Sequence, residues 1–170
     1  SNGQEEVDKL LNAMITVSDN DSANTLVGML GNGNDAAGQE AVNTYCKNNG
    51  YTDTSMGRML LEKASANENY TSARDCSVFL KNIYENKLEH SEDMLNLLKQ
   101  QTRTEKIPKG VPAGVETANK TGELDHVEND AAIVFDGENP YIICVMADNL
   151  SDTTEARQRI VDISSVVYEN

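Results

Sequence analysis

Aromatic residues are scarce in this sequence. It contains no Trp, and Phe, Tyr and Trp together make up 5% of its 170 residues. Hydrophobic residues as a whole reach 38%, a little under the usual share in globular proteins. The core must therefore be built from Leu, Ile, Val, Met and Ala, and we expect it to be modest. The length is that of one domain, so we predict a single domain over residues 1–170.

Basic residues and long apolar runs are also lacking, which excludes two classes of partner. The 14 Lys and Arg residues stand against 28 Asp and Glu residues, a formal net charge of −14. Such a chain repels a phosphate backbone, so no nucleic-acid partner is predicted. No apolar stretch approaches the roughly 18 residues of a membrane span, and no charged start leads into an apolar segment. We therefore predict neither a membrane span nor a signal peptide within these residues.

Cysteine and histidine are too few and too scattered for a metal site. Cys46, Cys76 and Cys144 form no C-x-x-C pair, so neither a zinc knuckle nor a disulfide-dense scaffold is expected. The odd number leaves at least one free thiol. Cys76 and Cys144 fall within apolar runs, so we expect both to be buried as small hydrophobic residues. His90 and His126 lack a second His or Cys at ligand spacing, and we predict no metal.

Hydrophobic periodicity predicts that the first 105 residues are mainly helical. Apolar residues recur at helical spacing, and caps rich in Ser, Asp, Asn and Gly separate the runs. Residues 51–70 show no clean period and are predicted to be mostly loop, which in a compact domain is often functional. The predicted helices cover residues 5–17, 23–30, 36–48, about 75–86 and 92–101.

The remainder of the chain changes character and predicts a sheet. Short β-prone runs at 115–122, 130–135 and 141–147 are separated by turn residues, which favours consecutive antiparallel strands. Residues 153–168 carry an apolar stripe suited to covering one face of that sheet. We therefore predict an α+β fold in which an antiparallel sheet is packed by a C-terminal helix (about 106–170) and adjoins a helical subdomain (about 5–105).

Two short motifs carry the chemical signal. Ser18-Asp19-Asn20 lies between two predicted helices, and Lys120-Thr121-Gly122 lies on the first predicted strand. Either motif alone is usually a helix cap or a strand end. In this order, with helices between them and two strands and a helix after them, they resemble the class A serine β-lactamases and penicillin-binding proteins. Residues 15–24 and 69–75 are similar to class A sequence too, and the resemblance covers about residues 7–167.

The resemblance implies a role for each motif residue in acyl transfer. Ser18 would be the hydroxyl that shuttles a proton to the leaving nitrogen, and Lys120 a fixed cation that polarises it. The backbone N–H of Glu123 would be one oxyanion-hole donor. Three further residues would bind the substrate. Asn20 would hold the substrate's amide side chain, and Thr121 would hydrogen-bond the substrate's carboxylate. Gly122 would let the strand backbone approach the ligand. The family needs no cofactor.

The sequence departs from the family in two respects. The family's nucleophile lies in a Ser-x-x-Lys motif upstream of Ser-Asp-Asn, and here no serine stands three residues before any lysine. Only 17 residues precede Ser18, so we expect a truncated chain or a segment supplied separately. The Glu-x-x-Leu-Asn motif that activates the deacylating water is also missing. Glu62 and Glu68 are the nearest carboxylates, and solvated surface charges explain them as well.

Two functions of different classes remain open. The first is a serine β-lactamase-like hydrolase that acts outside the cytoplasm of a bacterium on β-lactams or peptidoglycan stem peptides, with this chain inactive alone and its signal or anchor missing. The second is a non-catalytic binding module for a carboxylate-bearing peptide or a protein partner. A domain without its central helix would expose apolar surface, so we also expect a homodimer through the exposed core.

Overall fold

The computed structural model describes residues 2–63 and 67–170. The chain forms two compact units, Ser1–Asp75 and Cys76–Asn170. The α+β fold predicted from the sequence is confirmed, with an antiparallel sheet, a C-terminal helix against it and a helical part. The single domain with a helical subdomain to about residue 105 stays a prediction.

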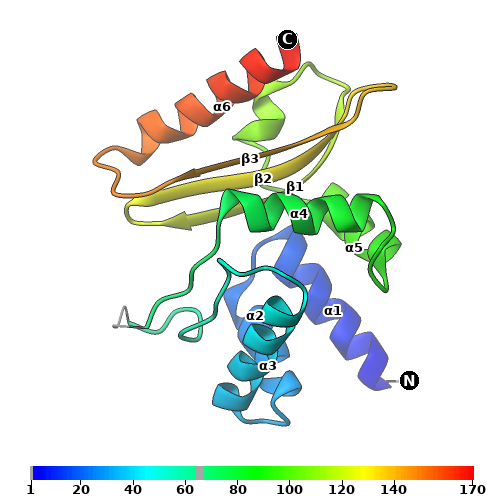
Figure 1. Cartoon of the computed structure of the whole chain (residues 1–170), viewed down its shortest axis with the longest axis vertical. Coiled ribbons are helices and arrows are strands. Elements are labelled where there is room, and N and C mark those ends of the chain that lie inside the picture. The colour runs from blue at the N-terminus through cyan, green and yellow to red at the C-terminus, as the bar shows by residue number, and fades with distance from the viewer. Residues whose placement is uncertain (1, 64–66) are drawn as a thin grey trace. The chain divides into compact units, whose positions relative to one another are not determined.

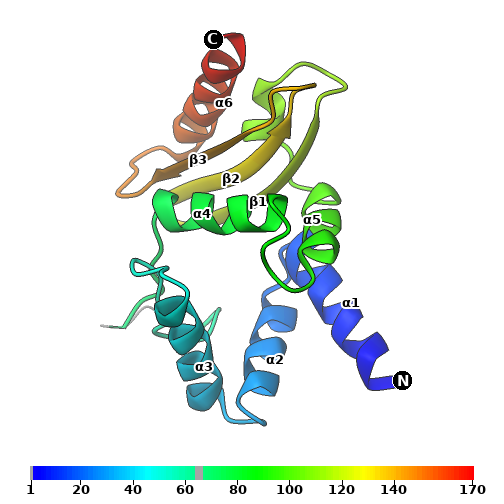
Figure 2. The ribbon, with the colours of Figure 1, turned by 45° about the vertical axis from the view of Figure 1, so that its right-hand side comes forward.

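The first unit is built on three helices, α1 (Asn2–Thr16), α2 (Asn20–Leu30) and α3 (Asp35–Asn48). Helix α2 packs against both α1 and α3 (Figure 2). Asp19 caps α2, because its side chain accepts a hydrogen bond of 2.7 Å from the backbone N–H of Ser22. The contact of α2 with α3 requires Gly38, since a Cβ there would lie 2.0 Å from the carbonyl oxygen of Val27.

The predicted loop of the first unit has little regular structure. One antiparallel bridge joins Ser55 to Tyr70, and residues 64–66 of the predicted loop lie outside the described residues. Amide side chains of two helices hold the loop in place. Asn24 bonds both the N–H and the C=O of Leu60, and Asn43 does the same for Met56.

The second unit is a three-stranded antiparallel sheet between helices. In Figure 1 and Figure 2, α6 lies on one face of the sheet, and α4 and α5 lie on the other. The strand order is β1-β2-β3, and a short 3₁₀ helix, η1, packs under α6. The elements are α4 (Ala73–Tyr84), α5 (Ser91–Lys99), η1 (Ile107–Gly110), β1 (Glu116–Leu124), β2 (Val127–Phe135), β3 (Tyr141–Ala147) and α6 (Thr153–Glu169).

The core of the second unit lies between the sheet and α6. Its buried members come from η1, two strands and the helix, and they are Ile107, Ala132, Val134, Ile143 and Ile160. Helix α6 thus covers one face of the sheet as predicted, but the predicted stripe is only partly right. Of its four members only Ile160 is buried, and the exposed ones are Ile163, Val166 and Val167. Every helix among the described residues is too short or too polar to cross a lipid bilayer.

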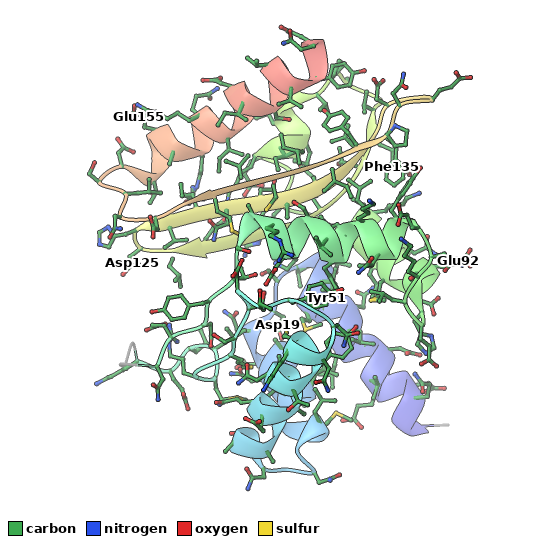
Figure 3. The ribbon with its side chains drawn as sticks, viewed as in Figure 1. Asp19, Tyr51, Glu92, Asp125, Phe135 and Glu155 are labelled. Carbon is green, nitrogen blue, oxygen red and sulfur yellow. The ribbon has the colours of Figure 1, made fainter. Side chains whose placement is uncertain are left out.

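Three sequence predictions need correction. The first two strands meet in a tight turn at Asp125 (Figure 3), so the first runs to Leu124 and the second begins at Val127, which is earlier than expected. Glu123 and Glu128 lie at these strand ends, and their charge made the ends resemble loop. Ion pairs with the buried Lys106 stabilise both residues within the sheet. The 3₁₀ helix η1 was not predicted. Cys76 and Cys144 are half-buried instead of buried, since β3 is an edge strand of the described sheet.

Candidate active site

The Lys-Thr-Gly motif lies in the middle of β1. Lys120, Thr121 and Gly122 pair with residues 131, 130 and 129 of β2. Because β1 is an edge strand of the described sheet, alternate backbone groups along it face away from β2. A Cβ on Gly122 would meet the Asn129 side chain only at 3.7 Å, an ordinary contact. Packing within the unit thus leaves room for a side chain at this position, so the second unit itself does not require glycine there.

Lys120 is held as a partly desolvated cation. Its Nζ donates a hydrogen bond of 2.8 Å to the carbonyl oxygen of Thr121, its neighbour on the strand. Burial lowers the pKa of Lys120 and the charge of Arg103 lowers it further, while the carboxylates of Asp130 and Glu123 act in the opposite direction. A cation with little hydration attracts an anionic ligand more strongly than one in bulk water does.

A charge network that the sequence did not reveal lies at one end of this strand. Lys106 is completely buried and pairs with Glu128 at 2.7 Å and with Glu123 at 3.1 Å. Arg157 of α6 donates to Glu128 at 2.7 Å, and Arg103 donates to Glu123 at 3.3 Å. One signal in the sequence could have indicated the network. Glu123 and Glu128 face each other across the strands, and two such carboxylates require a buried cation between them.

Glu123 is tied into this network by its side chain. Burial raises the pKa of its carboxyl, but the hydrogen bond from Lys106 and the charges of Lys106, Arg103 and Arg157 outweigh burial and hold the pKa below its usual value. Because Glu123 pairs with Glu128 across the strands, the network fixes the segment that carries the predicted oxyanion-hole donor.

Asp130 joins the sheet to η1. Its carboxylate accepts hydrogen bonds from the backbone N–H of Ile107 at 3.0 Å and from the side-chain amide of Asn119 at 3.1 Å. Burial raises the pKa of Asp130 to about 6, although these hydrogen bonds and the charge of Lys106 oppose it.

Ser18 occupies the turn between α1 and α2. Its backbone is left-handed, with a φ of 60°, a conformation that non-glycine residues adopt rarely and that often marks a functional turn. Ser18 is half-buried, and Asn20 begins α2 and is exposed. Side-chain and backbone hydrogen bonds with Ser22 lower the pKa of Asp19, which braces the turn as its cap.

The structure thus places the six predicted site residues in two groups. Ser18 and Asn20 belong to the first unit, and the four strand residues 120–123 follow one another in the second. Their individual roles stay predictions. Among the described residues, no group of three or more His, Cys, Asp or Glu side chains is arranged to hold a metal ion.

The two loop carboxylates have local partners. Glu68 forms an ion pair of 2.8 Å with Arg58. Glu62 accepts a bond of 3.2 Å from the N–H of Met59, and its own carbonyl accepts from Arg58 at 2.8 Å. These contacts explain both carboxylates as supports of the loop, so neither needs a role as a general base.

A large apolar groove opens in the first unit. Its volume is about 690 Å³, and its lining comes from α1, α2, α3 and the loop that follows them. The side chains are apolar with one exception, and they are Val7, Leu11, Met14, Ala23, Leu26, Val27, Met29, Leu30, Val42, Met56, Leu60 and Asn69. Apolar grooves of this kind are found at sites that bind a ligand or another polypeptide segment.

Known proteins resemble this chain throughout its length. Residues 2–170 match the family described as the Beta-lactamase enzyme family. The structure of PBP-A has 25% identity and a TM-score of 0.82, over 95% of this chain and 59% of PBP-A. The β-lactamase from Sphaerobacter thermophilus DSM 20745 has 26% identity and a TM-score of 0.82, over 95% of this chain and 61% of that enzyme.

A third structure gives chemical context. It is a PBP-A variant solved as an acyl-enzyme complex with penicillin G, at 25% identity and a TM-score of 0.82, over 95% of this chain and 60% of the variant. Among proteins with curated descriptions, none matches the sequence. The chain therefore spans about three fifths of the length of these solved structures.

Proposed function

Because this chain belongs to the β-lactamase enzyme family, we propose that it is the motif-bearing part of a serine hydrolase that takes acyl groups from β-lactams or D-alanyl-D-alanine peptides. The observation that carries the proposal is the Lys-Thr-Gly motif on an edge strand, with a partly desolvated Lys120 and an uncovered Gly122. The sequence contains no Ser-x-x-Lys, so these residues alone are inactive.

The proposed reaction divides the work between the two groups of residues. A serine outside this sequence attacks the carbonyl carbon, and its oxygen forms the acyl bond while the carbon–nitrogen bond breaks. Ser18 passes a proton to the leaving nitrogen, and Lys120 stabilises the charge on that hydroxyl as the proton moves. The N–H of Glu123 donates to the oxyanion.

Substrate binding uses the remaining residues of the motifs. Thr121 and Lys120 take the substrate carboxylate by a hydrogen bond and by charge. Asn20 holds the amide side chain of the substrate, and Gly122 lets the substrate lie along the edge of β1. Because the chain has a net charge of −14, the rest of the molecule attracts this anion little. Lys120 must therefore supply most of the electrostatic attraction for the carboxylate.

We propose that the acyl-enzyme is long-lived. Glu62 and Glu68 are engaged in the loop, and no other carboxylate of the loop stands in a deacylation motif. Without a general base, water attacks the ester slowly. This favours a penicillin-binding protein or a slow hydrolase over an efficient β-lactamase. Peptidoglycan and its stem peptides are outside the cytoplasm, so the proposal also predicts an extracytoplasmic protein.

The apolar groove supports a further part of the proposal. We propose that the segment with the nucleophilic serine packs into this groove, since about 690 Å³ of apolar space suits the buried face of a helix. Where that segment is absent, two copies of this chain cover their grooves against each other and form a homodimer.

Intact-mass spectrometry after incubation with a fluorescent penicillin tests the function. The 170-residue chain and a longer chain extended upstream should be compared. A single covalent adduct on the longer chain alone supports the hydrolase, and the lifetime of that adduct distinguishes a penicillin-binding protein from a β-lactamase. If neither chain is labelled and neither consumes the drug, the hydrolase proposal fails, and the chain is a binding module.

A further inference from the structure

We propose that Arg157 of α6 is a positioning residue for acyl transfer. It acts through Glu128 and Lys106, and the three side chains hold the backbone N–H of Glu123 in place at the edge of β1. The inference rests on the proposed function, because it takes this N–H to be the oxyanion-hole donor. All four residues belong to the second unit, and neither sequence motif includes Arg157.

The hydrogen bonds along β1 indicate which way the Glu123 N–H points. The N–H and C=O of one strand residue point to the same side, and successive residues alternate between the two sides. The carbonyl oxygen of Asn119 accepts a bond of 3.4 Å from the Gln101 side chain, and that of Thr121 accepts one of 2.8 Å from Lys120. Neither donor belongs to β2, so both carbonyls point away from that strand. Glu123 follows two residues after Thr121, and its N–H therefore points to the same edge.

Four contacts connect Arg157 to this strand position. Arg157 Nε donates to one carboxylate oxygen of Glu128 at 2.7 Å. The other Glu128 oxygen pairs with Lys106 Nζ at 2.7 Å, and Lys106 pairs in turn with Glu123 at 3.1 Å. The Arg157 guanidinium also lies 4.0 Å from the Glu123 carboxylate. The side chains of Lys106 and Glu128 are 0% and 1% exposed, so salt and water screen these charges little.

The burial of Glu128 makes Arg157 necessary. Arg157 and Lys106 share the Glu128 carboxylate, one on each oxygen. Without Arg157, one buried oxygen loses its donor, and the carboxylate keeps too little positive charge beside it. Lys106 is the cation already in contact, so it shifts toward Glu128 and away from Glu123, its more distant partner. The strand end that carries the Glu123 N–H then loses part of its support.

The displacement affects the rate of the reaction more than the binding of substrate. An oxyanion-hole donor stabilises negative charge that develops only in the transition state. The proposed ligands of the substrate carboxylate are Lys120 and Thr121, which precede Glu123 on the strand and lie outside the relay. A misplacement of about 1 Å can cost roughly 100-fold in rate, so a partial loss of support should cost about 10-fold.

The test is rapid-quench mass spectrometry of the chain extended upstream to include the nucleophile. It measures the acylation rate constant at saturating penicillin G and, separately, the half-saturating concentration. In Arg157→Met the rate constant should fall about 10-fold, and the half-saturating concentration should stay within about 2-fold. Arg157→Lys keeps a cation beside Glu128 and should recover most of the rate. The control is Arg159→Met, since Arg159 is 72% exposed and pairs with Glu155 of its own helix. It should acylate at the original rate.

Two readouts separate positioning from a loss of stability. The Arg157 side chain is 43% exposed, so Arg157→Met should still fold. A variant that is only less stable reduces the fraction of the chain that is acylated, whereas a displaced donor lowers the rate constant of every folded molecule. In the Glu128→Gln background, Arg157→Met should cause little further loss of rate, because both changes remove the same link.

The possible results distinguish this inference from the proposed function. If penicillin does not acylate the original extended chain, the proposed function fails and the inference fails with it. If the original chain is acylated, three results overturn the inference alone. They are an unchanged rate constant in Arg157→Met, a loss confined to the acylated fraction or to the half-saturating concentration, and an equal loss of rate from Arg157→Met in the Glu128→Gln background.

Discussion

The two units of this chain differ in how completely they bury their own apolar surface. In the second unit, Ile107, Ala132 and Val134 have no exposed surface, and the helix α6 closes one face of the sheet. In the first unit, Met29 and Leu30 are exposed beside an apolar groove. The strand motif therefore rests on a well-packed core, although α6 also exposes Ile163, Val166 and Val167. The turn that carries Ser18 joins two helices that line an open apolar groove. The two halves of the proposed site should respond differently to mutation.

The largest effect is expected from Lys106→Met in the second unit. The change removes the cation between Glu123 and Glu128 and leaves buried carboxylates with too little positive charge, at a cost of about 3–5 kcal/mol. Urea unfolding measures the loss. The matched control is Lys109→Met, three residues away and exposed, which should change the free energy of unfolding by less than about 0.5 kcal/mol. Equal losses in the two variants would contradict the importance of the buried network.

The first unit should be most sensitive at Gly38. An alanine there would place its Cβ 2.0 Å from the Val27 carbonyl, so α2 and α3 must separate, at a cost of roughly 1–3 kcal/mol. Gly3→Ala in α1 is the control, because a Cβ there meets nothing within 4 Å, and helix propensity predicts a gain of up to about 1 kcal/mol. Thermal unfolding distinguishes the two. A neutral Gly38→Ala would show that these helices do not need their close contact.

The pH dependence of stability tests the strand scaffold at Asp130. The pKa of Asp130 is about 6 in the folded state, above the ordinary value of 3.8. At a pH between these two values, the Asp130 carboxyl is protonated in the folded state and ionised in the unfolded state. The free energy of unfolding should therefore fall as pH rises from about 4 to 6, by up to about 3 kcal/mol from this group.

Asp130→Asn should remove that fall, and chemical denaturation at a series of pH values measures it. Asp125→Asn, in the tight turn between β1 and β2 (Figure 3), is the control and should keep the slope. If the free energy of unfolding of Asp130→Asn still falls over this pH range, other groups cause the pH dependence.

The smallest effect on stability, and a specific effect on association, is expected at the groove. Leu30→Gln replaces a groove side chain that is 60% exposed, so it should change the free energy of unfolding by less than about 0.5 kcal/mol while weakening the proposed homodimer. Leu124→Gln changes a leucine that is 61% exposed at the end of β1 and should leave association unchanged. Light scattering gives the result, and a monomer in the original chain would refute the homodimer.

The same contrast explains what the sequence could predict. The six helices of the described residues follow apolar spacing, and side-chain caps mark the start of three of them, as at Asp19, so their bounds were predicted to within a few residues. The ends of β1 and β2 were missed because Glu123 and Glu128 look like exposed loop residues until Lys106 is seen between them. A lysine has no sequence signature of burial, and its partners are distant in the chain.

The candidate site divides in the same way. Ser18 and Lys120 could be identified from the sequence, because each lies in a family motif of three consecutive residues. The environment of Lys120 comes from Arg103, Asp130 and Glu123, which approach it only after the strands pair, so no local pattern contains it.

The most direct test of the central claim is the rate at which penicillin acylates a chain extended upstream to include the nucleophile. We expect Lys120→Ala to reduce that rate at least about 100-fold, the scale of losing an electrostatic contact in an active site. Lys87→Ala, an exposed lysine of the second unit that pairs with Glu85, should acylate at the original rate. Equal rates in the two variants would contradict the assignment of the Lys-Thr-Gly strand to the active site.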